Sequence, residues 1–110
     1  MKLPNGEFAI IPTEKLTDYC LNSNHSSGKH KAKVFASALG ITVENADDLR
    51  ELIIQAAIEG EVIQQDSTEF GQLYKVDWEI PDRQDAIILR TLWEIKTTQP
   101  NPRLVSAFIR

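Results

Sequence analysis

The sequence predicts an α+β domain in which three helices precede a four-stranded antiparallel sheet. Apolar residues recur at helical spacing in the first half of the chain and alternate every second residue after Gly60. Short loops separate the consecutive strands, which favours an antiparallel meander. The 110 residues fit one compact domain and contain no linker, repeat or low-complexity tract. We therefore predict a single domain over residues 1–110.

The first two predicted helices flank a loop. Thr13 is expected to cap the first helix, whose apolar side carries Leu16, Tyr19 and Cys20. Residues 22–28 are rich in Asn and Ser and predict a loop. The second helix then runs to about residue 39 and stops at Gly40, with an apolar stripe of Ala32, Phe35, Ala36 and Leu39.

The third helix has the most regular pattern. Asn45 is its expected cap, with Asp48 three residues later as in a capping box, and Gly60 is its expected end. Its apolar residues follow the helical period throughout: Leu49, Leu52, Ile53, Ala56 and Ala57. This stripe should face the sheet.

Period-two alternation and turn residues define the strands. The expected strands are Glu61–Asp66, Gln72–Ile80, Ala86–Lys96 and Arg103–Ile109. A hairpin loop over residues 67–71 and a turn over residues 81–85 separate the first three. The expected shared core consists of Phe35, Leu52, Ile53, Ala56, Val76 and Trp93.

Composition limits the classes of function. Twelve basic residues against 16 acidic ones give a net charge of −4, which opposes a non-specific nucleic-acid coat but permits a local phosphate site. The single cysteine, Cys20, cannot form an internal disulfide. No apolar run approaches the roughly 20 residues of a membrane span, and the N-terminus lacks a signal-peptide core. We expect a cytoplasmic protein with no membrane partner.

The leading functional candidate is the basic stretch 28–33, where Lys29, His30, Lys31 and Lys33 occupy four of five consecutive positions. Unpaired N–H groups at a helix start suit an anion, and a histidine can exchange protons near neutral pH. His30 and Lys33 are three residues apart and can share a helix face. The alternative is a solvated helix start. The macrodipole disfavours lysines at this end of a helix, which slightly favours function.

Arg90 and Thr91 lie in the middle of the third strand between apolar neighbours. Arg90 therefore needs either an anion or an acidic partner, such as Asp77 or Glu79 on the neighbouring strand. Arg103 and Ser106 on the last strand are weaker candidates.

A zinc site is not expected. Such a site needs about four convergent ligands, and the chain offers only Cys20, His25 and His30 besides carboxylates. We predict no metal and no cofactor.

Four stretches carry a family resemblance: residues 16–22, 28–35, 90–93 and 102–107. They resemble a small bacterial family of domains that occur alone or at the ends of phage-type and polymorphic-toxin proteins. That family is similar to the toxin-type ribonucleases of the barnase, EndoU, colicin and RelE-like fold. The resemblance implies that His30 is the family histidine, followed by the basic residues Lys31 and Lys33. It also implies that Arg90 and Thr91 form the strand Arg-Thr pair, and that Ser106 replaces a threonine.

Two hypotheses follow. The first is a metal-independent endoribonuclease, or a toxin-like relative, in which a ribose 2′-hydroxyl attacks the adjacent phosphate. The expected catalytic set is His30 as acid or base, Lys33 and Arg90 on the phosphate, and Ser106 as a positioning hydroxyl, a role that Thr91 could also fill. Substrate would further be bound by Lys29, Lys31, Thr91 and Arg103.

The second hypothesis is a non-catalytic protein-binding module, one half of a small operon-encoded pair. Its partner would bind the exposed sheet face or an edge strand. The expected partners are thus RNA under the first hypothesis and a neutralising or other partner protein under the second. Convergence of His30, Lys33 and Arg90 in one cleft would favour catalysis.

Overall fold

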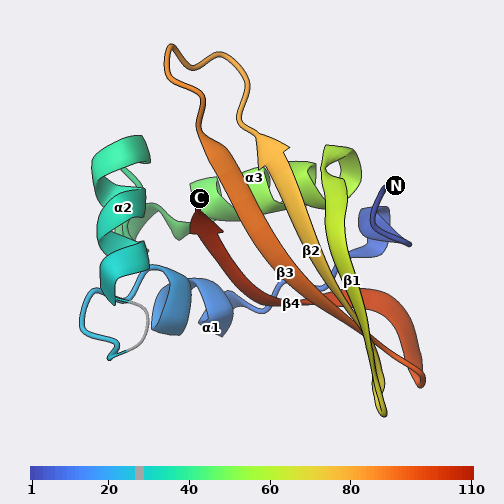
Figure 1. Cartoon of the computed structure of the whole chain (residues 1–110). Coiled ribbons are helices and arrows are strands. Elements are labelled where there is room, and N and C mark those ends of the chain that lie inside the picture. Colours follow the sequence, from blue (N-terminus) through green and yellow to red (C-terminus); the bar gives the residue numbers. More distant parts are fainter. Residues whose placement is uncertain (27–28) are drawn as a thin grey trace.

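The computed structural model describes residues 1–26 and 29–110 (Figure 1). Gly28 of the basic stretch and the last two residues of the predicted loop lie outside the described residues. In chain order the elements are η1 (Gly6–Phe8), α1 (Thr13–Lys15), η2 (Leu16–Cys20), α2 (Lys29–Leu39), η3 (Val43–Asn45), α3 (Ala46–Glu59), β1 (Glu61–Thr68), β2 (Gly71–Glu79), β3 (Ile88–Lys96) and β4 (Gln99–Ile109).

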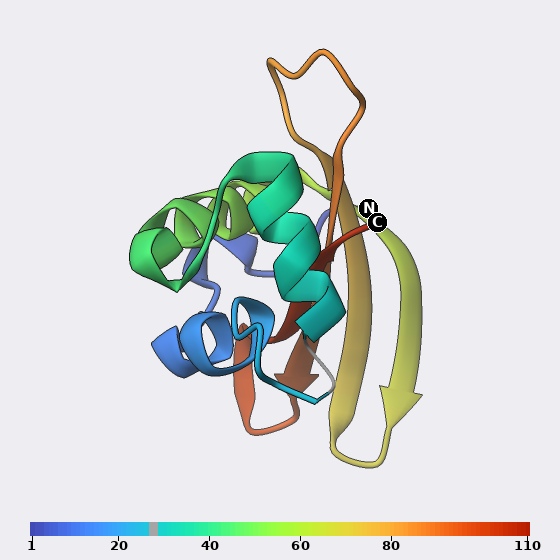
Figure 2. The same cartoon turned by 90° about the vertical axis from the view of Figure 1, so that its left-hand side faces the viewer.

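The predicted α+β class and the four-stranded antiparallel sheet are confirmed. The strands pair in the order β1-β2-β3-β4, and each neighbouring pair is antiparallel. The helices lie on one side of the sheet, as the edge-on view in Figure 2 shows. The opposite side, which we call the outer face, faces the viewer in Figure 1 and carries no helix.

The core lies between α3 and the inner face of the sheet. Five of the six expected core residues are buried: Phe35, Ile53, Ala56, Val76 and Trp93. Leu52 is half-buried and packs against this core. The apolar stripe of α3 therefore does face the sheet, as its period predicted.

The first helix differs from the prediction. Its first turn, α1, is α-helical and begins at Thr13, so Pro12 rather than Thr13 occupies the capping position. The continuation, η2, is a π-helix. The hydroxyl of Thr13 instead accepts a hydrogen bond from Arg50 of α3 at 2.8 Å. Thr13 thus joins the two helices and does not cap one of them.

The capping box of the third helix lies three residues earlier than predicted. The hydroxyl of Thr42 accepts from the backbone N–H of Glu44 at 3.3 Å, and the amide oxygen of Asn45 accepts from the N–H of Thr42 at 2.7 Å. Asn45 thus occupies the N3 position of the box, with Thr42 as the N-cap, and the turn η3 that it closes leads directly into α3.

The strand ends also shift. β1 runs to Thr68, so the β1–β2 hairpin turn is shorter than the five residues predicted. β4 begins at Gln99 instead of Arg103 and includes Pro100 and Pro102. Proline cannot donate to a ladder, but β4 lies at the edge of the sheet, where this loss is tolerated.

We predict that Ile53→Ala lowers the free energy of unfolding by about 2–5 kcal/mol, because Ile53 is fully buried and its truncation leaves a cavity. Ile58 is the matched control, since it lies on the same helix and is 44% exposed. Urea unfolding of both variants measures the difference. Equal midpoints for the two variants would show that the stripe of α3 does not carry the core.

Candidate functional site

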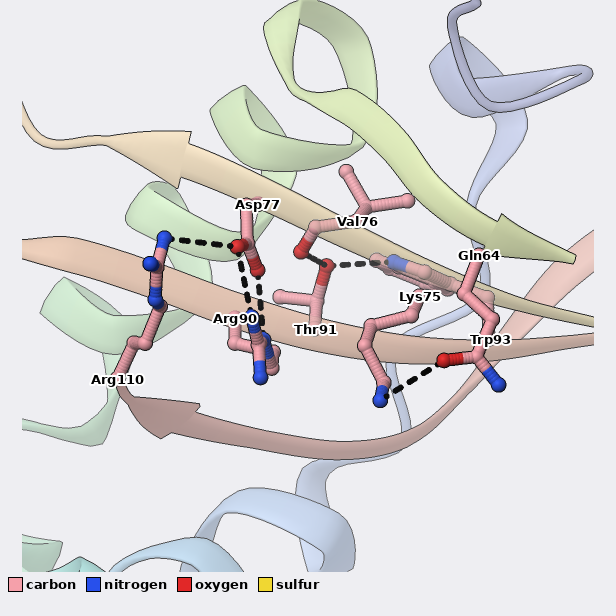
Figure 3. A network of polar contacts seen from close by, with 8 residues as sticks. All are labelled: Gln64, Lys75, Val76, Asp77, Arg90, Thr91, Trp93 and Arg110. Carbon is pink, nitrogen blue, oxygen red and sulfur yellow. Dashed lines mark hydrogen bonds and ion pairs between the residues drawn. The ribbon is translucent and has the colours of Figure 1, made fainter.

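Residues of β3 alternate between the two faces of the sheet. Leu89, Thr91 and Trp93 are buried on the inner face, so the intervening Arg90 lies on the outer face. The Thr91 hydroxyl donates to the carbonyl of Val76 at 3.3 Å and accepts from the indole N–H of Trp93 at 2.7 Å (Figure 3). Because this hydroxyl is buried and engaged, it is not available to a substrate, contrary to the binding role expected for Thr91.

Arg90 is bound by a carboxylate. Its Nε and Nη2 donate to the two oxygens of Asp77 at 2.8 and 3.0 Å, and Arg110 reaches the same carboxylate at 3.4 Å (Figure 3). Hydrogen bonding to Asp77 raises the pKa of Arg90 above its ordinary value. The acidic partner on the neighbouring strand, which the sequence left open, is therefore Asp77, and Arg90 is not a free cation.

The basic stretch forms the first turns of α2, as predicted. Lys29 and His30 are exposed, and the first turn contains no acidic residue. Lys31 is half-buried and turns toward β4, where its ammonium lies 4.4 Å from the ring centre of Phe108. Lys33 lies two residues further and therefore points to another side of the helix.

Lys33 lines a separate hollow. This hollow has a volume of about 300 Å³ and is bordered by the loop around Asn22 and by Thr42. The structure thus turns Lys31, not Lys33, toward the sheet. His30, Lys33 and Arg90 do not share one hollow, so the convergence that would favour catalysis is not observed among the described residues.

Phe108 of β4 lies next to predicted site residues from both α2 and β3. It pairs with Arg90 across β3 and β4, which places the two side chains next to each other on the outer face. Ser106 lies two residues earlier on β4, in unbroken register, and so on the same face as Phe108. Arg90 and Ser106 therefore share a face of the sheet with Phe108, and Lys31 of α2 reaches the ring of Phe108.

Ser106 has an unusual environment. It is only 4% exposed, and its hydroxyl has no hydrogen-bond partner among the residues that the structure describes. Buried hydroxyls are normally hydrogen-bonded, so this unpaired one is an exception, but its oxygen exposes almost no surface on which a substrate could bind.

Arg103 lies elsewhere. It is exposed and pairs with Glu94, four positions along β3 from Arg90, or roughly 13 Å at the ordinary strand rise. It borders its own hollow with Lys96 and Asn101. The structure does not bring Arg103 to the other predicted residues.

A second cluster, which the sequence analysis missed, surrounds Tyr19. The ammonium groups of Lys15 and Lys31 lie 5.9 and 5.8 Å from its ring centre. The ring of His25 meets it edge-on at 5.0 Å and 84°. The four-residue spacing of Lys15 and Tyr19 was an available signal, since such pairs are neighbours on a helix.

Two further findings concern metals and membranes. Within residues 1–26 and 29–110, no three His, Cys, Asp or Glu side chains are grouped as a metal site would require. None of the helices in this described part has the length and apolar composition that a membrane crossing requires.

The sequence matches the family DUF6883, a domain of unknown function, over residues 2–110. The chain belongs to the DUF6883 family. Its fold is similar to that of a chain in a contact-dependent growth inhibition toxin–immunity protein complex from Klebsiella pneumoniae 342. The TM-score is 0.69 at 11% identity, with 92% of this chain and 99% of that chain covered, so the likeness is one of fold. Comparison with curated proteins gave no match.

We predict that Arg90→Ala destabilises this DUF6883 domain by roughly 1–3 kcal/mol, because the carboxylate of Asp77, only 12% exposed, loses its closest partner. Lys96→Ala, at the exposed end of the same strand, is the control. Thermal or urea unfolding measures the effect. In the double variant with Asp77→Ala, the loss should be smaller than the sum of the single losses. Strict additivity would contradict a direct pair.

Proposed function

We propose that this DUF6883 domain is a toxin-type, metal-independent endoribonuclease whose site lies where α2 meets the end of β4. The observation that carries the proposal is the contact of Lys31 with Phe108, the cross-strand neighbour of Arg90 at the end of β4. Lys31 supplies there a cation without a carboxylate partner among the described ion pairs, which is a group that a phosphate needs. The guanidinium of Arg90 is bound to Asp77, so Arg90 is not one of the phosphate-binding cations in this proposal. Its part is structural, as the cross-strand neighbour of Phe108.

The chemistry requires proton transfer as well as charge. In the proposed reaction the ribose 2′-oxygen attacks phosphorus, the bond to the 5′-oxygen breaks, and a 2′,3′-cyclic phosphate and a 5′-hydroxyl result. The proton of the 2′-hydroxyl leaves to a base, and the 5′-oxygen takes a proton from an acid or from water. His30, exposed in the first turn of α2, supplies one of these proton transfers. Lys29 and Lys33 add positive charge on the remaining sides of that turn.

Similarity to a chain of a toxin–immunity protein complex supports a toxin-type or immunity-type role. The basic first turn of α2 favours the toxin-type role, since it offers charge to an RNA substrate.

A binding module is the second candidate, and a specific observation favours it. The outer face has no helix over it, and it holds a hollow of about 160 Å³ bordered by Leu73, Leu92 and Val105. Apolar side chains exposed on an open sheet are typical of a protein interface. Under this alternative Leu92→Arg would disrupt a complex with a protein encoded by a neighbouring gene, while Lys31→Ala would not.

We expect purified wild-type protein to cleave RNA in excess chelator, and His30→Gln to lower the rate by roughly 100- to 10,000-fold, the range for loss of an acid or base. Gel analysis of labelled RNA, with end-group analysis of the products, is the measurement. Lys96→Ala is the control for the loss of a remote charge. Uncleaved RNA with wild type, or equal cleavage by His30→Gln, would reject the proposal and favour the binding module.

A further inference from the structure

Tyr19 lies in a cluster that the proposed reaction does not use. It belongs to η2 and is half-buried, and cations from two different elements, Lys15 of α1 and Lys31 of α2, lie 5.9 and 5.8 Å from its ring centre. His25 adds an edge-on contact, which fixes the orientation of the ring. The sequence separation of these residues means that the fold, and not local spacing alone, assembles the cluster.

The two cations hold Tyr19 only loosely. Both ammonium groups lie close to the outer limit of about 6 Å for an attraction to a ring. Lys31 is closer to Phe108, at 4.4 Å, so its main contact is with that ring. Stacking of a nucleic-acid base on an aromatic ring contributes about 5- to 150-fold in affinity. A base can therefore replace these distant cations over Tyr19 at a net gain.

The cations of the cluster also lack acidic partners. In the part of the chain that the structure describes, the ion pairs involve the N-terminus, Lys2, Arg90 and Arg110, and neither Lys15 nor Lys31. Both ammonium groups act on the thiol of Cys20, where they favour ionisation, although burial dominates and raises the pKa of that thiol. Lys15 and Lys31 thus concentrate positive charge around the position of Tyr19.

We propose that Tyr19 is a stacking platform for one base of single-stranded RNA, with Lys15 and Lys31 binding the phosphates that flank this base. The proposal rests on the ribonuclease function above and deepens it, because it names the substrate class. Lys31 is shared: it contacts Phe108 at the proposed reaction site and Tyr19 at the platform. The platform therefore places a base directly beside the phosphate that is to be cleaved.

The platform selects single strands for a geometric reason. In A-form RNA the faces of the bases are covered by their neighbours in the stack, and only unpaired bases can be turned onto a protein ring. The Tyr19 ring is half-buried, so a base must leave its own stack to reach it.

The test measures binding without cleavage. A fluorescent 2′-O-methyl oligoribonucleotide of about 8 nucleotides, within the usual site size, cannot undergo 2′-hydroxyl attack. Anisotropy titrations should show that Tyr19→Ala weakens binding by about 5- to 150-fold, while Tyr19→Phe, which keeps the ring, binds like wild type. Phe70→Ala, at a ring that is 64% exposed on the β1–β2 turn, is the control and should leave binding unchanged. Circular dichroism confirms that each variant is folded.

Two further probes separate stacking from charge. An abasic strand of equal length should bind wild type and Tyr19→Ala equally, because it offers phosphates without bases. Tyr19→Ala should also bind a base-paired RNA duplex with the same affinity as wild type. Lys31→Gln should weaken both the intact and the abasic strand and reduce the salt dependence of binding.

Three outcomes would overturn the proposal: equal binding of the intact strand by wild type and Tyr19→Ala, an equal loss for the abasic strand, or preferential binding of a polyglutamate peptide. The last would assign the cluster to an acidic protein. Failure of the ribonuclease proposal is distinct, since it appears as uncleaved natural RNA and leaves these titrations unaffected.

Discussion

The burial of Trp93 in the middle of β3 is the constraint on which the rest of the fold depends. Its indole N–H needs a partner in the core, and Thr91, two residues earlier on the same face, supplies it at 2.7 Å. The same hydroxyl of Thr91 donates a second hydrogen bond, to the carbonyl of Val76 in β2. One polar chain in an apolar core thus fixes which face of β3 points inward. A slip by one residue would expose Trp93 and bury the charge of Arg90.

The outer face follows from that constraint. With Thr91 and Trp93 inward, Arg90 must point outward, where the register places Asp77 directly opposite on β2. The same register places Phe108 opposite Arg90 on β4, and Lys31 of α2 comes to rest on Phe108. The charged network in Figure 3 and the proposed phosphate site are therefore two consequences of one inward tryptophan.

The sequence could predict those features that depend on local periodicity. The change of period at Gly60, the stripe of α3 and the alternation of β3 are properties of neighbouring residues, and the structure confirms them. The role of Thr13 depends on Arg50 of α3, thirty-seven residues away, and no local pattern encodes that contact. Likewise, Asn45 was recognised as a capping residue, but its place in the box depended on Thr42, which an apolar pattern does not mark.

In the candidate site, too, some features follow from local periodicity and others depend on tertiary contacts. Periodicity placed Arg90 on the face opposite Leu89, Thr91 and Trp93, and it offered an anion, Asp77 or Glu79 as the partner. The register then decides for Asp77, because cross-strand neighbours follow from register. The sequence pattern assigned the phosphate to Lys33 because of its spacing from His30, whereas Lys31 is the lysine that turns toward β4. Only the docking of α2 beside β4 determines which side of the basic stretch faces the sheet. The Tyr19 cluster required three elements to meet, so its only trace in the sequence was the helical spacing of Lys15 and Tyr19.

Local charge and net charge are separate properties of this protein. The chain carries a net charge of −4, yet charges more than about 8 Å apart are largely screened at physiological ionic strength. What a phosphate experiences near α2 is therefore the nearby ammonium groups and not the distant carboxylates. The described ion pairs place Glu61 with Lys2 and Asp77 with Arg90 and Arg110, so these two carboxylates are paired with cations outside α2. Lys31, by contrast, rests on an aromatic ring, which orients the ammonium without neutralising it. An acidic domain can in this way keep a cation oriented and available for an anionic ligand.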